Sequence, residues 1–184
     1  MLLDRARAGS SRAMESLYTR CAGKLLPLIR LRMGRSLRSE LESQDILQAV
    51  LLKSFQRVAQ FEGRAGSLMA WMARIAENEI RDRADYQGRQ RRDVARRAAL
   101  DEAEELPQPV RSALSQVIVT EETDQLERAL EALPAGQCEI ILLRQFEELT
   151  FPEISARLGK SQDACRMMFA RAMTALTLKL SGRP

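Results

Sequence analysis

Apolar side chains recur at spacings of three and four positions along much of the chain, which is the period of one face of an α-helix. Over residues 42–61 this pattern predicts an amphipathic helix. Its buried stripe is expected to be Leu47, Val50, Leu51, Ser54, Phe55 and Val58. The opposite face carries Asp45, Gln48, Ala49, Leu52 and Gln56. An apolar Leu52 on this face hints at a partner surface, although one exposed Leu taken alone is also common on a solvated face.

A second amphipathic helix is expected over residues 67–87, with Ser67 as its N-cap. Its expected core face consists of Leu68, Trp71, Met72, Ile75 and Ile80. Arginines follow on and beyond this helix, namely Arg81, Arg83, Arg89, Arg91, Arg92, Arg96 and Arg97. An aromatic ring beside basic residues suits stacking on unpaired bases as well as phosphate contact. Burial in the core is the alternative for Trp71.

The clearest local pattern lies in residues 150–180. Thr150 and Glu153 have the spacing of a capping box, and Gly159 suits the left-handed residue that ends a helix. Ser161 can cap a second helix two residues later, and that helix is expected to bury Cys165, Phe169, Ala172 and Leu176. Two helices joined by a short turn predict a helix-turn-helix unit. Two preceding helices, at about 122–133 and 135–146, would complete a four-helix domain.

The outward face of this second helix follows from a turn of 100° per residue. It consists of Asp163, Arg166, Met167, Ala170, Arg171 and Thr174. In a major groove the N-terminal members of this set would meet base edges, and an Arg can bind guanine or phosphate. The alternative is a helical hairpin that packs on another surface and leaves Arg166 and Arg171 merely solvated. The capping box, the Gly turn and the Ser cap in register favour DNA binding.

The composition agrees with an all-α fold. Among 184 residues, Leu and Ala together number 50, whereas the β-branched Val, Ile and Thr number 20. The chain has no His, which excludes Ser-His-Asp triads and His-ligated metals. Its three Cys are scattered without a C-x-x-C pair, so we expect neither a disulfide framework nor a zinc site. Since no metal cluster, glycine-rich phosphate loop or paired-carboxylate site appears in the sequence either, we expect no cofactor and no enzyme. No apolar run reaches the roughly 18 residues of a membrane span, and no signal-peptide pattern opens the chain, so we expect a cytoplasmic protein without membrane insertion.

The charge is distributed unevenly. Residues 1–97 hold 20 Lys and Arg against 11 Asp and Glu, which indicates a surface for a polyanion, with solvated helix faces as the alternative. Residues 98–121 hold one basic and five acidic side chains and contain Pro107 and Pro109. Residues 122–184 are close to neutral. We therefore predict two small helical domains, 1–97 and 122–184, joined by an acidic linker over 98–121 that contains a short helical piece after Pro109.

Three segments, in this order, together resemble one family, the bacterial RNA polymerase sigma factors of the extracytoplasmic-function (ECF) group. QDILQAVLLKSF is similar to the region 2 helix that docks on the clamp helices of the polymerase β′ subunit. FEGRAGSLMAWMARIAENEIRD is similar to the segment that melts the promoter and recognises the −10 element. ALPAGQCEIILLRQFEELTFPEISARLGKSQDACRMMFARAM is similar to region 4, which reads the −35 element.

The resemblance implies a dissociable promoter-specificity subunit whose partners are core RNA polymerase, including its β subunit, and promoter DNA. The implied core polymerase-binding residues are Asp45, Gln48, Ala49 and Leu52. The implied −10 residues are Phe61, Arg64, Ser67, Trp71, Asn78 and Arg81. The implied −35 residues are Ser161, Gln162, Asp163, Arg166, Met167, Ala170 and Arg171. Relatives are often held by an anti-sigma factor, which is a further partner that the resemblance suggests.

The chain departs from the family pattern in its polymerase-facing helix. Many relatives carry acids where this chain has Gln44 and Ala49. Ser43 stands in this less acidic patch, where a phosphate would add about two negative charges near a helix start. We hypothesise that a Ser/Thr kinase switches polymerase binding through Ser43. Met168 stands where the family often has Arg, which weakens the expected phosphate contacts.

Two other functions fit parts of the sequence. A stand-alone helix-turn-helix transcriptional regulator would use the N-terminal domain as a helical sensory domain. A helical adaptor would bind only protein. The regulator would bind its operator without polymerase, whereas the adaptor would show no salt-dependent promoter affinity.

Overall fold

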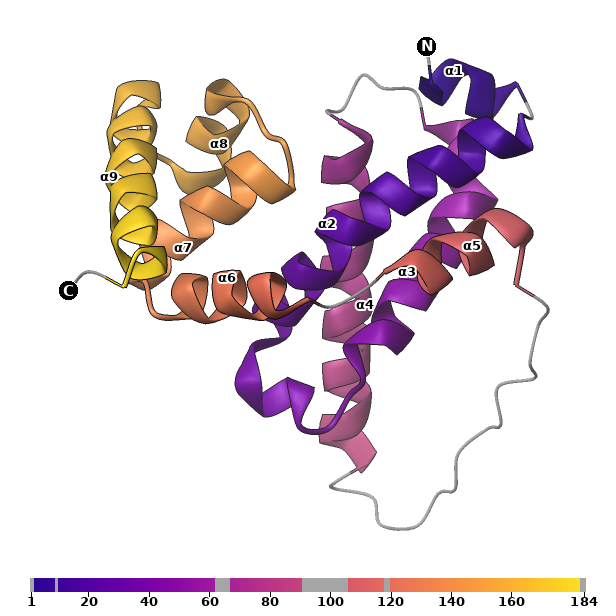
Figure 1. The fold of residues 1–184 in the computed structure, drawn as a ribbon, viewed down its shortest axis with the longest axis horizontal. Coiled ribbons are helices and arrows are strands. Elements are labelled where there is room, and N and C mark those ends of the chain that lie inside the picture. Colours follow the sequence, from indigo (N-terminus) through magenta and orange to yellow (C-terminus); the bar gives the residue numbers. More distant parts are fainter. Residues whose placement is uncertain (1, 9, 62–66, 91–105, 118–119, 183–184) are drawn as a thin grey trace. The chain divides into compact units, whose positions relative to one another are not determined.

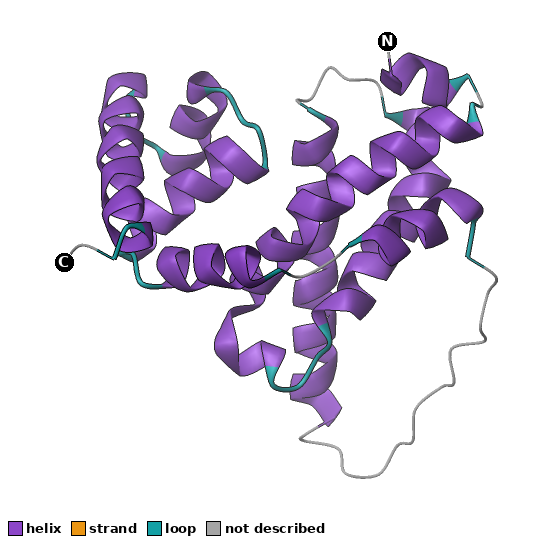
Figure 2. Cartoon of the chain, viewed as in Figure 1, coloured by secondary structure: helices purple, strands orange, loops and turns teal. Residues whose placement is uncertain are grey.

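The computed structural model describes residues 2–8, 10–61, 67–90, 106–117 and 120–182. Every regular element in these ranges is helical, as Figure 2 shows, so the predicted all-α class is confirmed. The chain divides into two compact units. The first comprises Met1–Glu62 and Met72–Val117, and the second comprises Gly63–Trp71 and Ile118–Pro184. None of the helices in the described ranges is both long and apolar enough to cross a membrane.

The first unit is built around the long helix α2 (Ser11–Arg38), which is kinked at the non-helical Gly34. Helices α1 (Leu2–Arg7), α3 (Ser43–Arg57) and α5 (Gln108–Gln116) pack against it (Figure 1). A 3₁₀ turn, η1 (Val58–Gln60), extends α3, and α4 (Leu68–Gln90) supplies the remaining core residues. The large, fully buried side chains of this unit are Tyr18, Leu25, Leu28, Ile29, Ile46, Leu47, Leu51 and Met72.

One polar pair lies inside this core. Ser54 Oγ donates a hydrogen bond to Tyr18 Oη at 3.2 Å, and both side chains are fully buried. Burial raises the pKa of Tyr18 to about 12. The pair explains why the buried stripe of α3 contains a serine, since a buried hydroxyl without a partner is costly.

The predicted buried face of α3 is mostly confirmed, whereas the buried face of α4 is rotated from the predicted one. On α3, Phe55 is half-buried and Ile46 is buried instead. On α4, the predicted core residues Leu68, Trp71 and Ile75 are only half-buried, whereas Met72 and Ile80 are buried as expected. The face that is buried consists of Met69, Ala70, Met72, Ala73, Ala76, Glu79 and Ile80.

Helix α5 lies inside the stretch that the sequence predicts as a linker. Val110 and Ala113 are fully buried, and Ser112 Oγ donates a hydrogen bond to the carboxylate of Glu15 on α2. The first unit therefore extends to Val117, beyond the predicted boundary at residue 97. The acidic residues 101–105 of the predicted linker lie outside the described residues.

The second unit contains α6 (Glu121–Glu131), α7 (Ala135–Ile141), the π-helical turn η2 (Leu142–Phe146), α8 (Phe151–Leu158) and α9 (Gln162–Leu180). Its core includes the fully buried Leu130, Ile140, Ile141, Leu143, Ile154, Cys165 and Ala172. Helices α6, α7 and α8 all pack against α9. The two helices expected before the helix-turn-helix are present, the second ending in a π turn.

The predicted signals around the turn between α8 and α9 are confirmed. Thr150 and Glu153 form the capping box, and their hydrogen bonds hold the pKa of the Glu153 carboxyl below its ordinary value. Gly159 has a φ of +63°, the left-handed conformation that suits glycine. Ser161 Oγ accepts the N–H of Ala164 at 3.2 Å and so begins α9. These local interactions fix the direction in which α9 leaves the turn.

Candidate functional site

The outward face of α3 presents an acid and an amide. Asp45 and Gln48 are exposed, whereas Ala49 and Leu52 are half-buried. The core residues of α3 point to the other side and so fix this orientation. Asp45 lies in the first turn of α3, where a carboxylate is favoured by the helix dipole. Ser43 is the first residue of the helix and is half-buried.

A buried carboxylate links α3 to α4. Glu79 is 9% exposed, and its carboxylate accepts hydrogen bonds from Lys53 on α3 and from Arg83 Nε one turn later on α4, the latter at 2.8 Å. Burial alone would raise the pKa of Glu79, but the hydrogen bonds from Lys53 and Arg83 outweigh it and hold the pKa below its ordinary value of 4.5. Glu79 is therefore an anion that fixes α4 against the helix carrying Asp45. No local pattern in the sequence marks Glu79 as part of such a group.

Replacing Glu79 by Gln should destabilise the first unit. Lys53 and Arg83 reach solvent, so we expect a loss of about 1–2 kcal/mol in the free energy of unfolding at neutral pH. Because the pKa of Glu79 is lowered on folding, its contribution is present above the ordinary value of 4.5 and is lost as the pH falls through the folded pKa. Urea unfolding of the variant and the unsubstituted chain should therefore differ at pH 7 and converge in acid.

Asp82→Asn is the matched control, since Asp82 lies on the same helix and is exposed. It should change the unfolding free energy little at either pH. A Glu79→Gln variant as stable as the unsubstituted chain at pH 7, or a difference that persists in acid, would contradict the assigned role of Glu79.

The predicted −10 residues fall into three groups. Ser67 caps α4, accepting the N–H of Ala70 at 3.1 Å, and Trp71 is half-buried on the first turn. Asn78 and Arg81 are exposed further along α4, where Arg81 Nη1 donates to Asn78 Oδ1 at 3.3 Å. Phe61 is only 5% exposed and packs in the core just after η1, so its ring is not presented at the surface. Arg64 lies outside the described residues.

The outward face of α9 matches the prediction in full. Its predicted members, Asp163, Arg166, Met167, Ala170, Arg171 and Thr174, are all exposed, as are Ser161 and Gln162 at its start. Met167 is 55% exposed, so its apolar side chain is accessible on this face. The face offers two guanidiniums, an amide, a carboxylate and an apolar side chain within its first three turns. Such a mixture suits contact with base edges, including a thymine methyl group.

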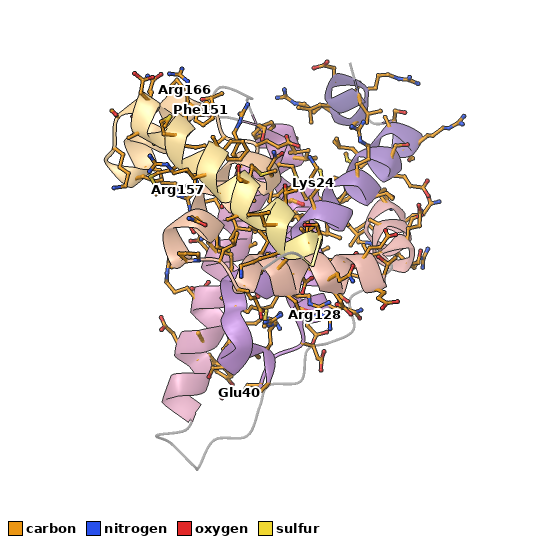
Figure 3. The ribbon with its side chains drawn as sticks, turned by 60° about the vertical axis from the view of Figure 1, so that its left-hand side comes forward. Lys24, Glu40, Arg128, Phe151, Arg157 and Arg166 are labelled. Carbon is orange, nitrogen blue, oxygen red and sulfur yellow. The ribbon has the colours of Figure 1, made fainter. Side chains whose placement is uncertain are left out.

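Arg166 is held by its neighbours. Its Nη1 donates to Asp163 Oδ1 at 2.7 Å, and its guanidinium lies 5.5 Å from the ring centroid of Phe151 at the start of α8. Figure 3 shows the two labelled residues close together. A second guanidinium, from Arg144, lies 5.1 Å from the same centroid and donates to the carbonyl of Leu149 at 2.8 Å.

An ion pair between the buried Glu147 and the partly exposed Arg157 supports the helix-turn-helix. Glu147 is 1% exposed, and Arg157 Nη1 on α8 donates to its Oε2 at 2.9 Å. The pair joins the segment after η2 to α8. Sequence reasoning missed it because the two residues are ten positions apart across a turn, and no local pattern marks such a pairing.

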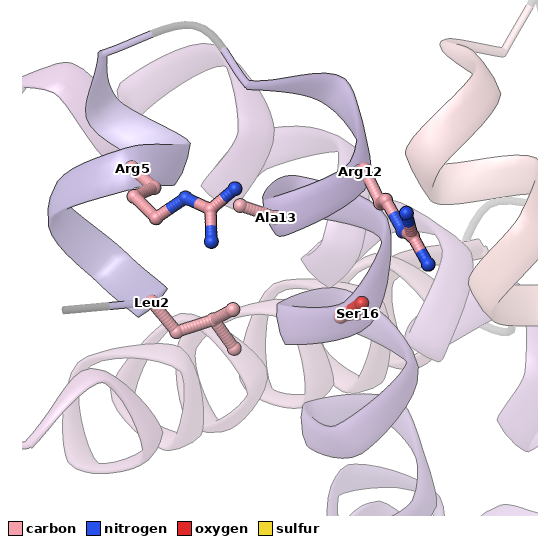
Figure 4. Close-up of a pocket in the computed structure, with 5 residues that line it drawn as sticks. All are labelled: Leu2, Arg5, Arg12, Ala13 and Ser16. Atoms are coloured by element: carbon pink, nitrogen blue, oxygen red, sulfur yellow. The ribbon is translucent and has the colours of Figure 1, made fainter.

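A pocket of about 190 Å³ lies between α1 and the start of α2. It is lined by Leu2 and Arg5 of α1 and by Arg12, Ala13 and Ser16 of α2 (Figure 4). None of these residues belongs to the predicted sites. Within the described ranges, no three His, Cys, Asp or Glu side chains gather as a set of metal ligands.

Two family models match this chain, one in each predicted domain. The model described as "Sigma-70 region 2" matches residues 21–90, and the one described as "Sigma-70, region 4" matches residues 123–176. The chain belongs to the sigma-70 family. All predicted polymerase-binding and −10 residues of this sigma factor lie in the region 2 match, and all predicted −35 residues lie in the region 4 match.

Curated relatives place the sigma factor in the ECF group. It is 28% identical over 174 residues to the ECF RNA polymerase sigma factor SigD of Mycobacterium tuberculosis, covering 93% of this chain and 78% of SigD. It is 31% identical over 183 residues to the probable RNA polymerase sigma factor RfaY of Xanthomonas campestris, covering 98% of this chain but only 44% of that protein.

The solved structure of CnrH in complex with the cytosolic domain of CnrY has a similar fold. Its TM-score is 0.50 at 22% identity, and the match covers 100% of the sigma factor and 97% of that chain.

Proposed function

We propose that this ECF sigma factor is the dissociable promoter-specificity subunit of bacterial RNA polymerase. In this role it acts in the cytoplasm, binds core polymerase and directs it to promoters, and it has no catalytic residue of its own. The observation that carries the proposal is the match of both region 2 and region 4 to one chain. Asp45, Gln48, Asn78 and Arg81 are exposed on helices of the region 2 match, and the outward face of α9 is exposed in the region 4 match.

Core polymerase is proposed to bind the outward face of α3. Asp45 and Gln48 supply an exposed acceptor and an amide, and the partly covered Leu52 and Ala49 supply apolar contact beside them. A polar rim around an apolar centre is the usual composition of a protein interface. An anti-sigma factor is the partner expected to compete for this face. A kinase acting on Ser43 would add charge at the edge of the same face, and this stays a hypothesis.

Promoter opening is proposed to depend on α4. Unstacking a base costs a few kcal/mol, which contacts with the flipped base can offset only where that base fits. Trp71 offers an aromatic edge, and the Asn78–Arg81 pair offers donors and an acceptor two turns further along the helix. The selectivity of melting would arise from this fit. The −35 element is proposed to bind the outward face of α9 in the major groove, with Arg166 reading a base and Arg171 contacting phosphate.

Partner dependence tests this function against a stand-alone regulator. A footprint of promoter DNA should require both the sigma factor and core polymerase, and it should extend over the −10 and −35 elements. A footprint of equal strength with the purified chain alone would favour the regulator and contradict the proposal. Binding to polymerase with no promoter-dependent footprint would instead favour the helical adaptor.

A further inference from the structure

The Arg166 side chain is restrained although it is half exposed. Its relative exposure is 53%, yet the carboxylate of Asp163 and the ring of Phe151 both engage its guanidinium. A free arginine on a helix surface samples many rotamers and loses this freedom when it binds. A guanidinium that is already oriented loses less, which favours the bidentate contact with O6 and N7 of guanine.

Phe151 is itself fixed in place. It is the first residue of α8, whose start is set by the capping box of Thr150 and Glu153. Its ring packs edge-to-face on Phe169 of α9, with centroids 6.0 Å apart and planes at 71°. The Arg144 guanidinium lies near the same ring and is anchored on the Leu149 carbonyl. The ring is therefore a rigid support carried by α8 for a side chain of α9.

We infer that Phe151 is a positioning residue for promoter recognition, because its ring orients the Arg166 guanidinium toward a base of the −35 element. Asp163 restrains the same guanidinium from within α9. The inference rests on the proposed function, since it concerns how the −35 face works. Phe151 is absent from the predicted site residues because it belongs to the preceding helix and looks like an ordinary core residue in the sequence.

The test measures −35 base preference with the holoenzyme. A library varied at the −35 element is selected with core polymerase and each sigma variant. Phe151→Leu and Phe151→Met remove the aromatic face and keep apolar volume. A cation–π contact at an exposed site is modest, so preference at the position read by Arg166 should fall about threefold to fivefold. Phe151→Tyr keeps the ring and should keep the preference.

Phe169→Leu is the matched control, because it removes the edge-to-face ring pair but leaves the Phe151 ring beside Arg166. It should destabilise the second unit about as much as Phe151→Leu in thermal unfolding, with a smaller loss of base preference because the Phe151 ring remains beside Arg166. In an Arg166→Ala background, Phe151→Leu should cause no further loss of preference.

Three results would overturn the inference: preference unchanged in Phe151→Leu and Phe151→Met, an equal loss in Phe169→Leu, or a full additional loss in the Arg166→Ala background. If the unsubstituted holoenzyme shows no −35 preference at all, the proposed function fails and the inference fails with it. These outcomes are distinguishable, since the first three require an unsubstituted protein that discriminates.

Discussion

Replacing Asp45 by Arg should lower the affinity of the sigma factor for core polymerase at least tenfold. The Asp45 carboxylate is exposed on the proposed polymerase-binding face, and reversing its charge would place a cation opposite the polymerase group that Asp45 is proposed to bind. Losing one member of a charge pair that is buried and hydrogen-bonded in the complex typically costs about 2–5 kcal/mol, which exceeds a tenfold change in affinity. Affinity is measured by titrating labelled core polymerase with each variant.

The control is Glu122→Arg, which makes the same charge reversal in the first turn of α6. Glu122 is exposed and belongs to the second unit, where we assign no polymerase contact. Its affinity for polymerase should stay within about twofold of the unsubstituted chain, as expected for a charge outside the contact. If Asp45→Arg bound as tightly as this control, the face of α3 would not be the polymerase-binding surface.

Replacing Arg166 by Ala should relax selection at one base pair of the −35 element. A bidentate contact between an arginine and a base is worth about 1–3 kcal/mol of discrimination, which corresponds to about 5- to 150-fold. Binding to other −35 sequences should weaken less, since only the preferred base loses a partner. The measurement is competitive binding of holoenzyme to promoters that differ at single −35 positions.

Two further substitutions, Arg171→Ala and Lys179→Ala, distinguish recognition of a base from sequence-independent attraction to the phosphate backbone. Arg171 is proposed to contact phosphate, so its loss should weaken all sequences alike and reduce the salt dependence of binding. Lys179 lies exposed in the last turn of α9 and has no assigned contact. A uniform loss in Arg166→Ala, matching that in Arg171→Ala, would show that Arg166 does not read a base.

Local signals in the sequence were sufficient to predict the helix-turn-helix. The capping box, the left-handed Gly159 and the Ser161 cap each act within a few residues. The stripe from Cys165 to Leu176 then determines which face of α9 is left outside. Since these interactions are short in range, the outward face could be derived from spacing alone.

Features that depend on distant contacts were missed. The buried face of α4 includes Met69, Ala73 and Ala76. Alanine is common on every face of a helix, so in the sequence the larger Leu68 and Trp71 suggest a different buried face. No helix bounds were predicted before residue 42, where α2 runs through Pro27, a residue that normally interrupts a helix. Contacts such as Lys53 with Glu79, 26 positions apart, or Ser112 with Glu15, 97 apart, leave no local pattern in the sequence.

The most direct test of the account is transcription in vitro from a promoter library with purified core polymerase. Adding the sigma factor should produce new transcripts that begin at a shared distance from common −10 and −35 sequences, and Asp45→Arg should abolish most of them. Transcripts that begin at the same positions with and without the chain would contradict the central claim that it directs polymerase to promoters.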